Sequence, residues 1–408
     1  MYFQLSCRLA AALLVLFSLI GATPNPPRAL AQTAAKPRTI TVVETAGLER
    51  KGWPITASIL VDKKEIDTPD DLNLWRDAGT PQEKRIAVQV LDVVTPEFIE
   101  AKDKPEARAD LLAIEFCFLA DLPANGTVTY QLRTGKPDAT APAAQLPVTP
   151  LTVTGEDLGR TVDTGPARFA FDPASGQLLS YTPTLAGMKQ PLTFNQGEPR
   201  PVHWNPDVWA PPLPWGHTSD WARGKPGREI EHTKIRSGPV ALRILRAGIM
   251  PTSNGVKTSV TYTAFAGMPF LLESSSMEFT ANTHVNAVRN NELVFNRSQH
   301  THGVWINEAG QVNTVLGYDP AEPKKFRGYL GSVDDPMIPF IGLFHNTQRY
   351  GIGIVNLARL AYAPLSIAST QDRSHYYFLD YGDHGTGERY EWNFMYVSRS
   401  EIPNATIV

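Results

Sequence analysis

Cysteine is nearly absent from this sequence, which has two cysteines among its 408 residues. Cys7 lies in an N-terminal segment that we expect to be removed, and Cys117 lies in an apolar run and is expected to be buried in the core. A single remaining thiol cannot form an intramolecular disulfide. The folded chain must therefore be stabilised by packing rather than by covalent links.

The sequence also lacks an excess of charge of one sign. Its formal net charge is -3, and no block of like charges occurs along the chain. Nucleic acids and anionic membranes attract proteins with a positive surface field, so neither is an expected partner. No Gly-x-Ser-x-Gly sequence and no Gly-rich phosphate loop is present, which argues against esterases, kinases and dinucleotide-binding enzymes.

The N-terminus has the pattern of a secretory signal peptide. Arg8 precedes an apolar run over residues 9–20, and a proline-rich stretch then ends in Ala29, Leu30 and Ala31. The run is shorter than the roughly 20 residues that span a bilayer, so cleavage after Ala31 is favoured over a membrane anchor. We expect residues 1–31 to be removed and the mature chain to be secreted or periplasmic, with no membrane anchor.

The hydrophobic pattern is typical of strands. Helical periodicity rarely extends beyond two turns, whereas alternation with a period of two recurs between Gly, Pro, Asn and Asp residues. In residues 389–397, for example, every second residue is aromatic. The sequence therefore predicts a mostly β chain, with one short polar helix near residues 96–110.

A change in composition divides the chain. Residues 134–150 are rich in Pro, Ala and small polar residues, as linkers are. This boundary predicts a small N-terminal β-barrel over residues 40–140, followed by a large antiparallel β-sandwich over residues 150–402. The second part has no internal linker, which favours a single sandwich.

Short pieces of the chain resemble a known family. Residues 41–56 contain a Val-Glu-Thr and a Trp-Pro-Ile-Thr strand, and residues 118–126 end in Ala-Asn-Gly before a Tyr-Gln-Leu strand. Together with residues 162–171, these pieces resemble the N-terminal barrel and central sandwich of the YetA-like and exo-rhamnogalacturonan lyase-like proteins. The resemblance implies a barrel, a sandwich and polysaccharide lyase activity. Family members of the lyase type continue into a helical toroid that this sequence lacks, so activity is implied less strongly than fold.

The most unusual segment is a Pro-rich loop, residues 202–221, which contains half of the eight tryptophans. Indole faces stack on sugar rings, and neighbouring polar groups can bind hydroxyls or transfer protons. The alternative is that the tryptophans pin the loop onto the sandwich as a lid. The candidate substrate-binding residues are His203, Trp204, Asn205, Trp209, Trp215, Asp220, Trp221 and, from a later strand end, His345.

A divalent metal is a further candidate. His300 and His302 are two residues apart, and on a strand both imidazoles would point to the same face. Two such histidines are half of a metal site, which Asp383 or His384 could complete. The alternative is that they cap the end of a sheet.

Residue types suited to β-elimination of a uronate occur near the ends of apolar strands. A cation must neutralise the carboxylate, an acceptor must remove the C5 proton, and a donor can protonate the leaving oxygen. Arg349 or a metal could supply the cation, and His217 or Tyr381 could accept the proton. The candidate catalytic residues are His217, Arg349, Tyr381 and His384.

The leading prediction is a secreted polysaccharide lyase that cleaves a uronate-containing polysaccharide or oligosaccharide. One alternative is a non-catalytic carbohydrate-binding protein, in which the histidines only cap strands. Another is a glycoside hydrolase, which needs two carboxyl groups about 5–9 Å apart. The aspartates available for such a pair are Asp207, Asp220, Asp334, Asp335, Asp380 and Asp383. Convergence of His217, His300, His302 and His384 in one cleft would favour an enzyme, and their dispersal over the surface would rule out this catalytic site.

Overall fold

The computed structural model describes residues 37–94, 111–137, 139–184, 201–203, 206–222, 224–296, 300–306, 310–316, 328–333, 340–345, 347, 350–356, 365–369, 373–384 and 389–400. The expected signal peptide, the expected helix at residues 96–110, and Trp204, Asn205, Arg349, Asp334 and Asp335 lie outside these residues. Strands after residue 356 are described by their backbone alone.

The prediction of a mostly β chain is confirmed. The described residues form five sheets, and all pairs of neighbouring strands in them are antiparallel. Two short 3-10 helices, η1 (Lys63–Glu65) and η2 (Thr218–Asp220), interrupt them. No helix in the described part of the chain is long and apolar enough to cross a membrane.

The N-terminal part consists of two sheets around one core, and its described strands do not close into a single barrel. The core between the sheets includes Leu74, Phe116, Phe118 and Tyr130. One sheet has the order β1 (Arg38–Val43), β7 (Thr127–Thr134), β3 (Leu72–Arg76), β4 (Lys84–Ile86). The other has the order β2 (Arg50–Asp62), β6 (Leu111–Leu122), β5 (Val88–Val94).

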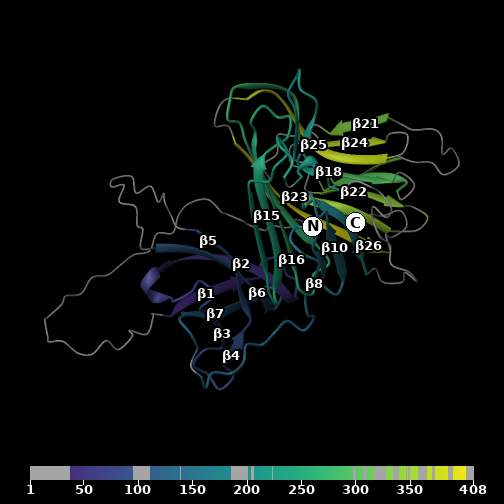
Figure 1. Ribbon diagram of the computed structural model, residues 1–408. Helices are drawn as coiled ribbons and strands as arrows, with labels where there is room; N and C mark the ends of the chain where they lie inside the picture. Colours follow the sequence, from purple (N-terminus) through teal and green to yellow (C-terminus); the bar gives the residue numbers. More distant parts are fainter. Residues whose placement is uncertain are drawn as a thin grey trace.

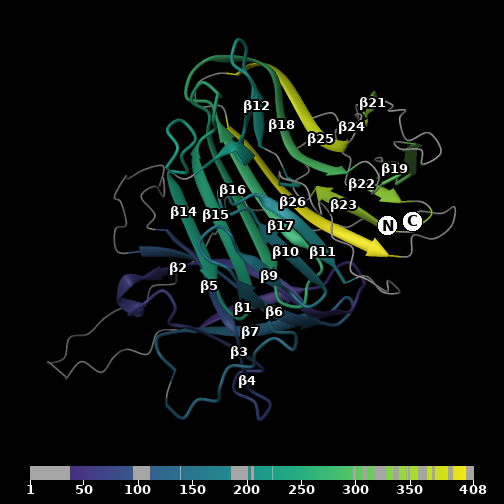
Figure 2. The same ribbon diagram turned by 45° about the vertical axis from the view of Figure 1, so that its right-hand side comes forward.

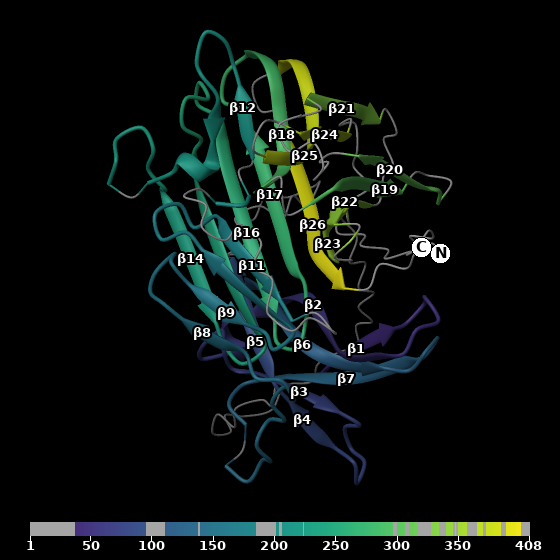
Figure 3. The same ribbon diagram turned by 90° about the vertical axis from the view of Figure 1, so that its right-hand side faces the viewer.

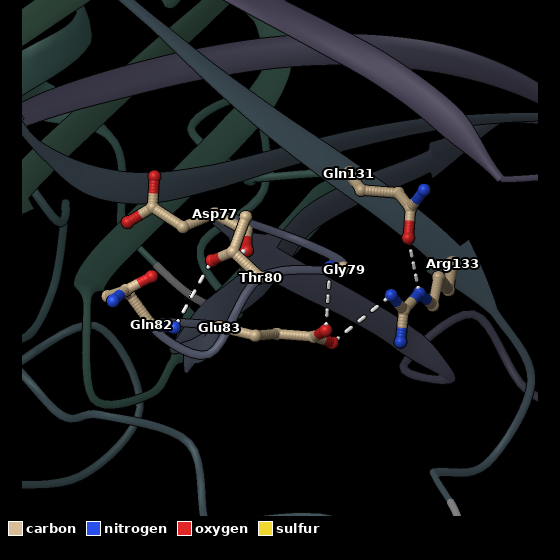
Figure 4. Close-up of polar contacts among 7 residues, drawn as sticks. All are labelled: Asp77, Gly79, Thr80, Gln82, Glu83, Gln131 and Arg133. Carbon is tan, nitrogen blue, oxygen red and sulfur yellow. Dashed lines mark hydrogen bonds and ion pairs between the residues drawn. The ribbon is translucent and has the colours of Figure 1, made fainter.

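Polar contacts tie the β3–β4 turn to β7, as Figure 4 shows. The Glu83 carboxylate accepts a hydrogen bond from the backbone N of Gly79 at 2.8 Å and pairs with Arg133 of β7 at 3.2 Å. Arg133 also donates to Gln131 at 2.6 Å, and its guanidinium lies 4.6 Å from the ring centre of Trp75. Arg133 thus links the turn to β7 through its contacts with Glu83, Gln131 and Trp75.

The C-terminal part contains three sheets, whose strands lie above and to the right of the N-terminal ones in Figure 1. The nine-stranded sheet has the order β14 (His232–Ser237), β15 (Ala241–Ile249), β16 (Lys257–Phe265), β17 (Leu271–Glu278), β26 (Arg389–Ser400), β23 (Tyr350–Asn356), β22 (Phe340–His345), β19 (His302–Ile306), β20 (Val312–Leu316). The six-stranded sheet has the order β13 (Gly216–His217), β12 (Asp207–Trp209), β18 (Thr283–Asn296), β25 (Arg373–His384), β24 (Leu365–Ser369), β21 (Gly328–Val333). The four-stranded sheet has the order β11 (Leu178–Pro183), β10 (Ala167–Phe171), β9 (Thr161–Asp163), β8 (Thr152–Thr154).

One large core joins these three sheets. It includes Phe169 and Tyr181 from the four-stranded sheet, Val208 and Val288 from the six-stranded sheet, and Tyr262 from the nine-stranded sheet. The nine-stranded sheet therefore packs against the other two, which is the expected sandwich arrangement. Figure 2 shows its long strands β14–β17 and β26 side by side, and in Figure 3 β12, β18 and β25 lie toward the end away from the N-terminal sheets.

A second, smaller core joins the N-terminal and C-terminal parts. Cys117 is buried there among apolar residues that include Leu91 and Phe265, and its burial raises the pKa of its thiol to about 12. The Gln89 amide accepts hydrogen bonds from the backbone N of Val240 and Ala241 at 3.1 and 2.9 Å. The expected core position of Cys117 is thus confirmed, and this core lies where the two parts meet.

Candidate functional site

A short hairpin at the edge of the six-stranded sheet brings three charged or titratable residues together. In the hairpin, Asp207 of β12 is directly opposite His217 of β13. On its other side, β12 pairs with β18, and Asp207 is opposite Arg289. Directly opposed residues in antiparallel strands share a face of the sheet, so the three side chains form one row.

Asp207 is the centre of this row. It is fully buried, and its Oδ2 lies 2.9 Å from Nδ1 of His217. Arg289 donates from Nε to Oδ1 at 3.0 Å and from Nη2 to Oδ2 at 2.5 Å, a bidentate pair. The His217 and Arg289 side chains keep 15% and 13% of their surface exposed. The buried carboxylate therefore fixes the orientation of the His217 imidazole and the Arg289 guanidinium, which both reach the surface.

The charges in the row shift the pKa values of its members. Burial alone would raise the pKa of Asp207, but the charge of Arg289 and the bond to His217 lower it overall. Burial alone would lower the pKa of His217, but the bond to Asp207 and its charge raise it overall, and Asp220 adds to this effect. Asp207 is thus held ionised, and His217 binds a proton more readily than an isolated histidine.

Two tryptophans extend the row toward solvent. The rings of Trp209 and Trp215 stack with centres 5.6 Å apart, and Trp215 stacks on His217 at 6.0 Å. The guanidinium of Arg289 lies 3.9 Å from the ring centre of Trp215. Trp209 is 37% exposed, so the stack leads from an accessible indole through Trp215 to a histidine that can transfer protons. We call these five residues, Asp207, Trp209, Trp215, His217 and Arg289, the hairpin site.

A turn from the nine-stranded sheet holds the hairpin in place. A Cβ added to Gly216 would lie 1.9 Å from the carbonyl oxygen of Pro251, so only glycine allows this close approach. Thr252 donates from Oγ1 to the carbonyl oxygen of Trp215 at 2.9 Å. The backbone of Trp215 and Gly216, on the β13 side of the hairpin, is therefore held against this turn.

Two residues of the same loop that we expected to contact substrate lie inside the domain. His203 is fully buried and its Nδ1 lies 2.5 Å from Oη of Tyr262. Trp221 is 1% exposed and donates from Nε1 to the carbonyl oxygen of Ile249 at 2.9 Å. For these two residues the structure favours the alternative that they pin the loop onto the sandwich, because a glycan cannot reach an enclosed side chain.

The expected metal-binding histidines lie on the other sheet. His302 begins β19 of the nine-stranded sheet, whereas Asp383 and His384 end β25 of the six-stranded sheet. His300 is 1% exposed, and its burial lowers its pKa to about 3. No group of three His, Cys, Asp or Glu residues in the described part of the chain has a geometry that could hold a metal. The metal therefore stays a prediction from the sequence.

His345 belongs to this histidine group. The charge that it would carry when protonated lowers the pKa of both His300 and His302, after the larger effect of their burial. His302 stacks on Phe344 at 5.0 Å, and both His300 and His345 contact the ring of Tyr350. His345 is 8% exposed, so this cluster is a largely enclosed part of the sheet.

The strand that carries Tyr381 and His384 runs beside the hairpin site. It is β25, which pairs with β18, and in that register Leu379 is opposite Arg289 and His384 is opposite Thr283. His217 and His384 thus belong to the same sheet, while His300 and His302 border the other. Arg349 lies outside the described residues.

Sequence reasoning missed Arg289 altogether. Asp207 was predicted only as one of several aspartates that a glycoside hydrolase could use, and its pairing with Arg289 was not predicted. The strand at residues 283–296 contains two charged residues, Arg289 and Glu292, in a pattern that does not alternate, so the sequence offered only a weak signal. Which carboxylate Arg289 pairs with depends on strand register, and the sequence does not show it.

Comparisons with known proteins concern the fold. No protein-family model matches the sequence, and no curated protein matches it significantly. A solved glycosyl hydrolase family 38 protein from Enterococcus faecalis is 10% identical, with a TM-score of 0.51 over 90% of this chain and 45% of that chain. A solved alpha-mannosidase from Enterococcus faecalis is 11% identical, with a TM-score of 0.52 over 90% of this chain and 43% of that chain. This chain spans less than half the length of either protein, and the likeness shows a shared fold.

Proposed function

We propose that this protein is a secreted or periplasmic carbohydrate-active protein that binds a glycan at the hairpin site. The observation that carries the proposal is the stack of Trp209 and Trp215 beside the His217–Asp207 pair. An exposed indole offers a flat apolar face to a sugar ring, and the imidazole next to it can move a proton. The names of the two solved structures of similar fold, a glycosyl hydrolase and an alpha-mannosidase, agree with a carbohydrate ligand.

The reaction that we propose is β-elimination from a uronate-containing glycan. In its neutral form, His217 accepts the C5 proton at Nε2, because Nδ1 is committed to Asp207. Asp207 then stabilises the imidazolium that forms, by its charge. The electron pair of the broken C–H bond forms the C4–C5 double bond, and the glycosidic oxygen leaves C4 with the electron pair of the broken C–O bond and takes a proton from a Tyr or His donor or from water. Lyase activity is also what the resemblance to the YetA-like family implies.

The uronate carboxylate needs a positive group of its own. Arg289 is held by both oxygens of Asp207, so its charge is largely compensated. The neutralising cation in this proposal is therefore Arg349 or a divalent metal, as the sequence predicts. A glycoside hydrolase is less consistent with this site, because Asp207 is kept ionised and enclosed and cannot act as the acid.

The second candidate function is carbohydrate binding without catalysis. It is favoured by the separation of His300 and His302 from the hairpin site, since they border the nine-stranded sheet. In that case His217 serves only to complete the row with Asp207 and Arg289.

One set of incubations separates these functions. The mature protein is mixed with a panel of uronate-containing polysaccharides, with and without divalent metal, while ultraviolet absorbance reports the unsaturated product. A rise that is lost in His217→Gln, and kept in His232→Gln at an exposed position on β14, supports the lyase. New reducing ends without absorbance indicate a hydrolase. Binding without either product indicates the non-catalytic protein.

The compartment has its own test. Expression of the full chain in a bacterium that exports Sec substrates, followed by N-terminal sequencing of the periplasmic protein, should give Gln32 as the first residue. Recovery of an uncleaved chain in the cytoplasm would contradict export.

A further inference from the structure

A chain of buried hydrogen bonds runs through the sandwich core to the residue that follows His217. His203 Nδ1 lies 2.5 Å from Oη of Tyr262, which donates to Oε1 of Gln177 at 2.9 Å. Gln177 then donates from Nε2 to Oγ1 of Thr218 at 2.9 Å. All four side chains are at most 1% exposed. We call them the buried chain.

The buried chain has a single direction. The one hydroxyl proton of Tyr262 is donated to Gln177, so Tyr262 can only accept at its contact with His203. With the Gln177 amide in this orientation, His203 carries its proton on Nδ1. Burial and then the charge of Arg246 lower the pKa of His203 well below its usual value, which keeps the imidazole neutral. Every donor in the chain thus has one defined acceptor.

Thr218 links the buried chain to the hairpin site. It is the first residue of η2, and its backbone N donates to the carbonyl oxygen of Pro206, just before β12, at 3.1 Å. Its own carbonyl oxygen accepts from the backbone N of Trp221 at 3.3 Å. Thr218 therefore connects the start of one hairpin strand with the end of the other, and η2 contains Asp220.

An apolar core could be built without these groups. Burying Gln, Tyr and His side chains costs desolvation that hydrogen bonds only partly offset, and comparable polar sites are often replaceable by apolar residues. What these bonded side chains add is a defined geometry, because each polar group stays satisfied only while its neighbours keep their positions. The residue at which these bonds end, Thr218, directly follows His217, so they fix the backbone next to His217.

We propose that Gln177 and Tyr262 are positioning residues for His217: through Thr218 they fix the β13–η2 junction and so hold the imidazole against Asp207. This inference rests on the proposed role of His217 in proton transfer. The charged groups that face His217 are Asp207 from β12, Arg289 from β18 and Asp220 from η2. A junction that is free to shift changes its distance from both carboxylates.

The test compares two substitutions at Thr218. Thr218→Val keeps the shape of the side chain and removes the hydroxyl, whereas Thr218→Ser keeps the hydroxyl. The readout is the pKa of His217, followed by NMR of the imidazole in the folded protein. We expect it to fall by about half a unit or more in Thr218→Val, toward the value of a free histidine, and to stay at the wild-type value in Thr218→Ser.

A matched control is Ser253→Ala. Ser253 is a buried hydroxyl in another turn of the same part, where it donates to the carbonyl oxygen of Met250 and accepts from the backbone N of Val256. A merely structural contribution of Thr218 predicts equal losses of stability in the two variants and an unchanged His217. An unchanged pKa of His217 in folded Thr218→Val would overturn the proposal.

Two further measurements keep the test decisive. If Thr218→Val does not fold, Tyr262→Phe removes the hydroxyl in the middle of the buried chain and should lower the same pKa. In the wild-type protein, nitrogen NMR of His203 must show the proton on Nδ1, and a proton on Nε2 alone would contradict the chain. These readouts need no substrate, so a failure of the lyase proposal leaves them interpretable, and an active lyase should show the same shift in its pH profile.

Discussion

Nδ1 of His217 lies 2.9 Å from Oδ2 of Asp207, a carboxylate with no exposed surface. The two residues are opposite each other in a hairpin whose strands hold only three and two residues. Arg289 reaches the same carboxylate from the adjacent strand. A buried negative charge is thus shared by the Arg289 guanidinium and the His217 imidazole, and this pairing makes both stability and the pKa of His217 depend on Asp207.

Replacing Asp207 by Asn should destabilise the protein and lower the pKa of His217. The substitution leaves the guanidinium of Arg289 poorly compensated, and breaking a buried pair in this way costs about 3 kcal/mol. Urea unfolding measures the loss. Asp163→Asn is the control, since that carboxylate accepts a hydrogen bond from Gly165 at an exposed turn and its loss should cost about 1 kcal/mol or less. Equal effects of the two substitutions would contradict the central role of Asp207.

Substitutions of two tryptophans in the same loop should have different effects, one on glycan binding and the other on stability. Trp209→Ala removes an exposed stacking surface, so we expect glycan binding to weaken by about tenfold, which is about 1.4 kcal/mol, with little change in stability. Trp221→Ala leaves a cavity in the core and should cost about 3–5 kcal/mol of stability. Affinity electrophoresis and thermal unfolding separate these outcomes. Unchanged binding in Trp209→Ala would remove the hairpin site as the glycan platform.

The buried His300 should make the protein sensitive to acid. Its pKa is about 3 in the folded state, where burial disfavours the charged form, whereas in the unfolded chain it takes up a proton near pH 6.5. Stability is therefore present above about pH 6.5 and is lost as the pH falls toward the folded value. As the pH falls from about 6.5 to 5, protonation of His300 in the unfolded chain should lower the free energy of unfolding by about 2 kcal/mol.

The substitution His300→Phe tests this dependence. It keeps a ring against Tyr350 and removes the titration, so the difference in stability between variant and wild type should shift in favour of the variant as the pH falls. His232→Phe, at an exposed position, should follow the wild-type curve. Parallel curves for His300→Phe and wild type, measured by urea unfolding at pH 5 and 7, would refute the prediction.

Glu273 should have the opposite dependence on pH. Its burial raises its pKa to about 8, against the opposing effects of the bond to Ser275 and the charge of Arg246, while the unfolded chain has the ordinary value of 4.5. The stability it contributes is fully present below about pH 4.5 and is lost as the pH rises through about 8. As the pH rises from about 4.5 to about 8, the free energy of unfolding of Glu273→Gln should increase relative to the wild type by up to about 1.4 kcal/mol per pH unit. The half-buried Glu278 on the same strand provides the control substitution to Gln.

Much of the strand content followed from local pattern. The strand predicted from aromatic alternation in residues 389–397 falls within β26 (Arg389–Ser400). The expected N-terminal barrel instead consists of two sheets, because closure depends on which strands pair over long separations, such as β1 with β7. Period-two alternation shows which face is buried and not which strand lies next to it.

The composition of the loop at residues 202–221 marked it as unusual, but it did not show which of its residues are buried and which form the hairpin site. His203 and His217 are the same residue type in the same loop, yet one is enclosed beneath Tyr262 and the other is paired with Asp207. Burial, and then the charge of Arg246 on β15, lower the pKa of His203, whereas the bond to Asp207 and its charge raise the pKa of His217. The loop sequence indicates neither the burial of one histidine nor the pairing of the other with Asp207.

The sequence by itself determined that this chain is built of strands, that it contains only two cysteines, and that aromatic and titratable residues are concentrated in one loop. These are properties of composition and of neighbours along the chain. The tertiary structure decided that Asp207 pairs with Arg289 across 82 positions, and that Gln177 reaches Thr218 across 41. Both contacts depend on strand register and sheet packing, which arise from interactions summed over the whole core.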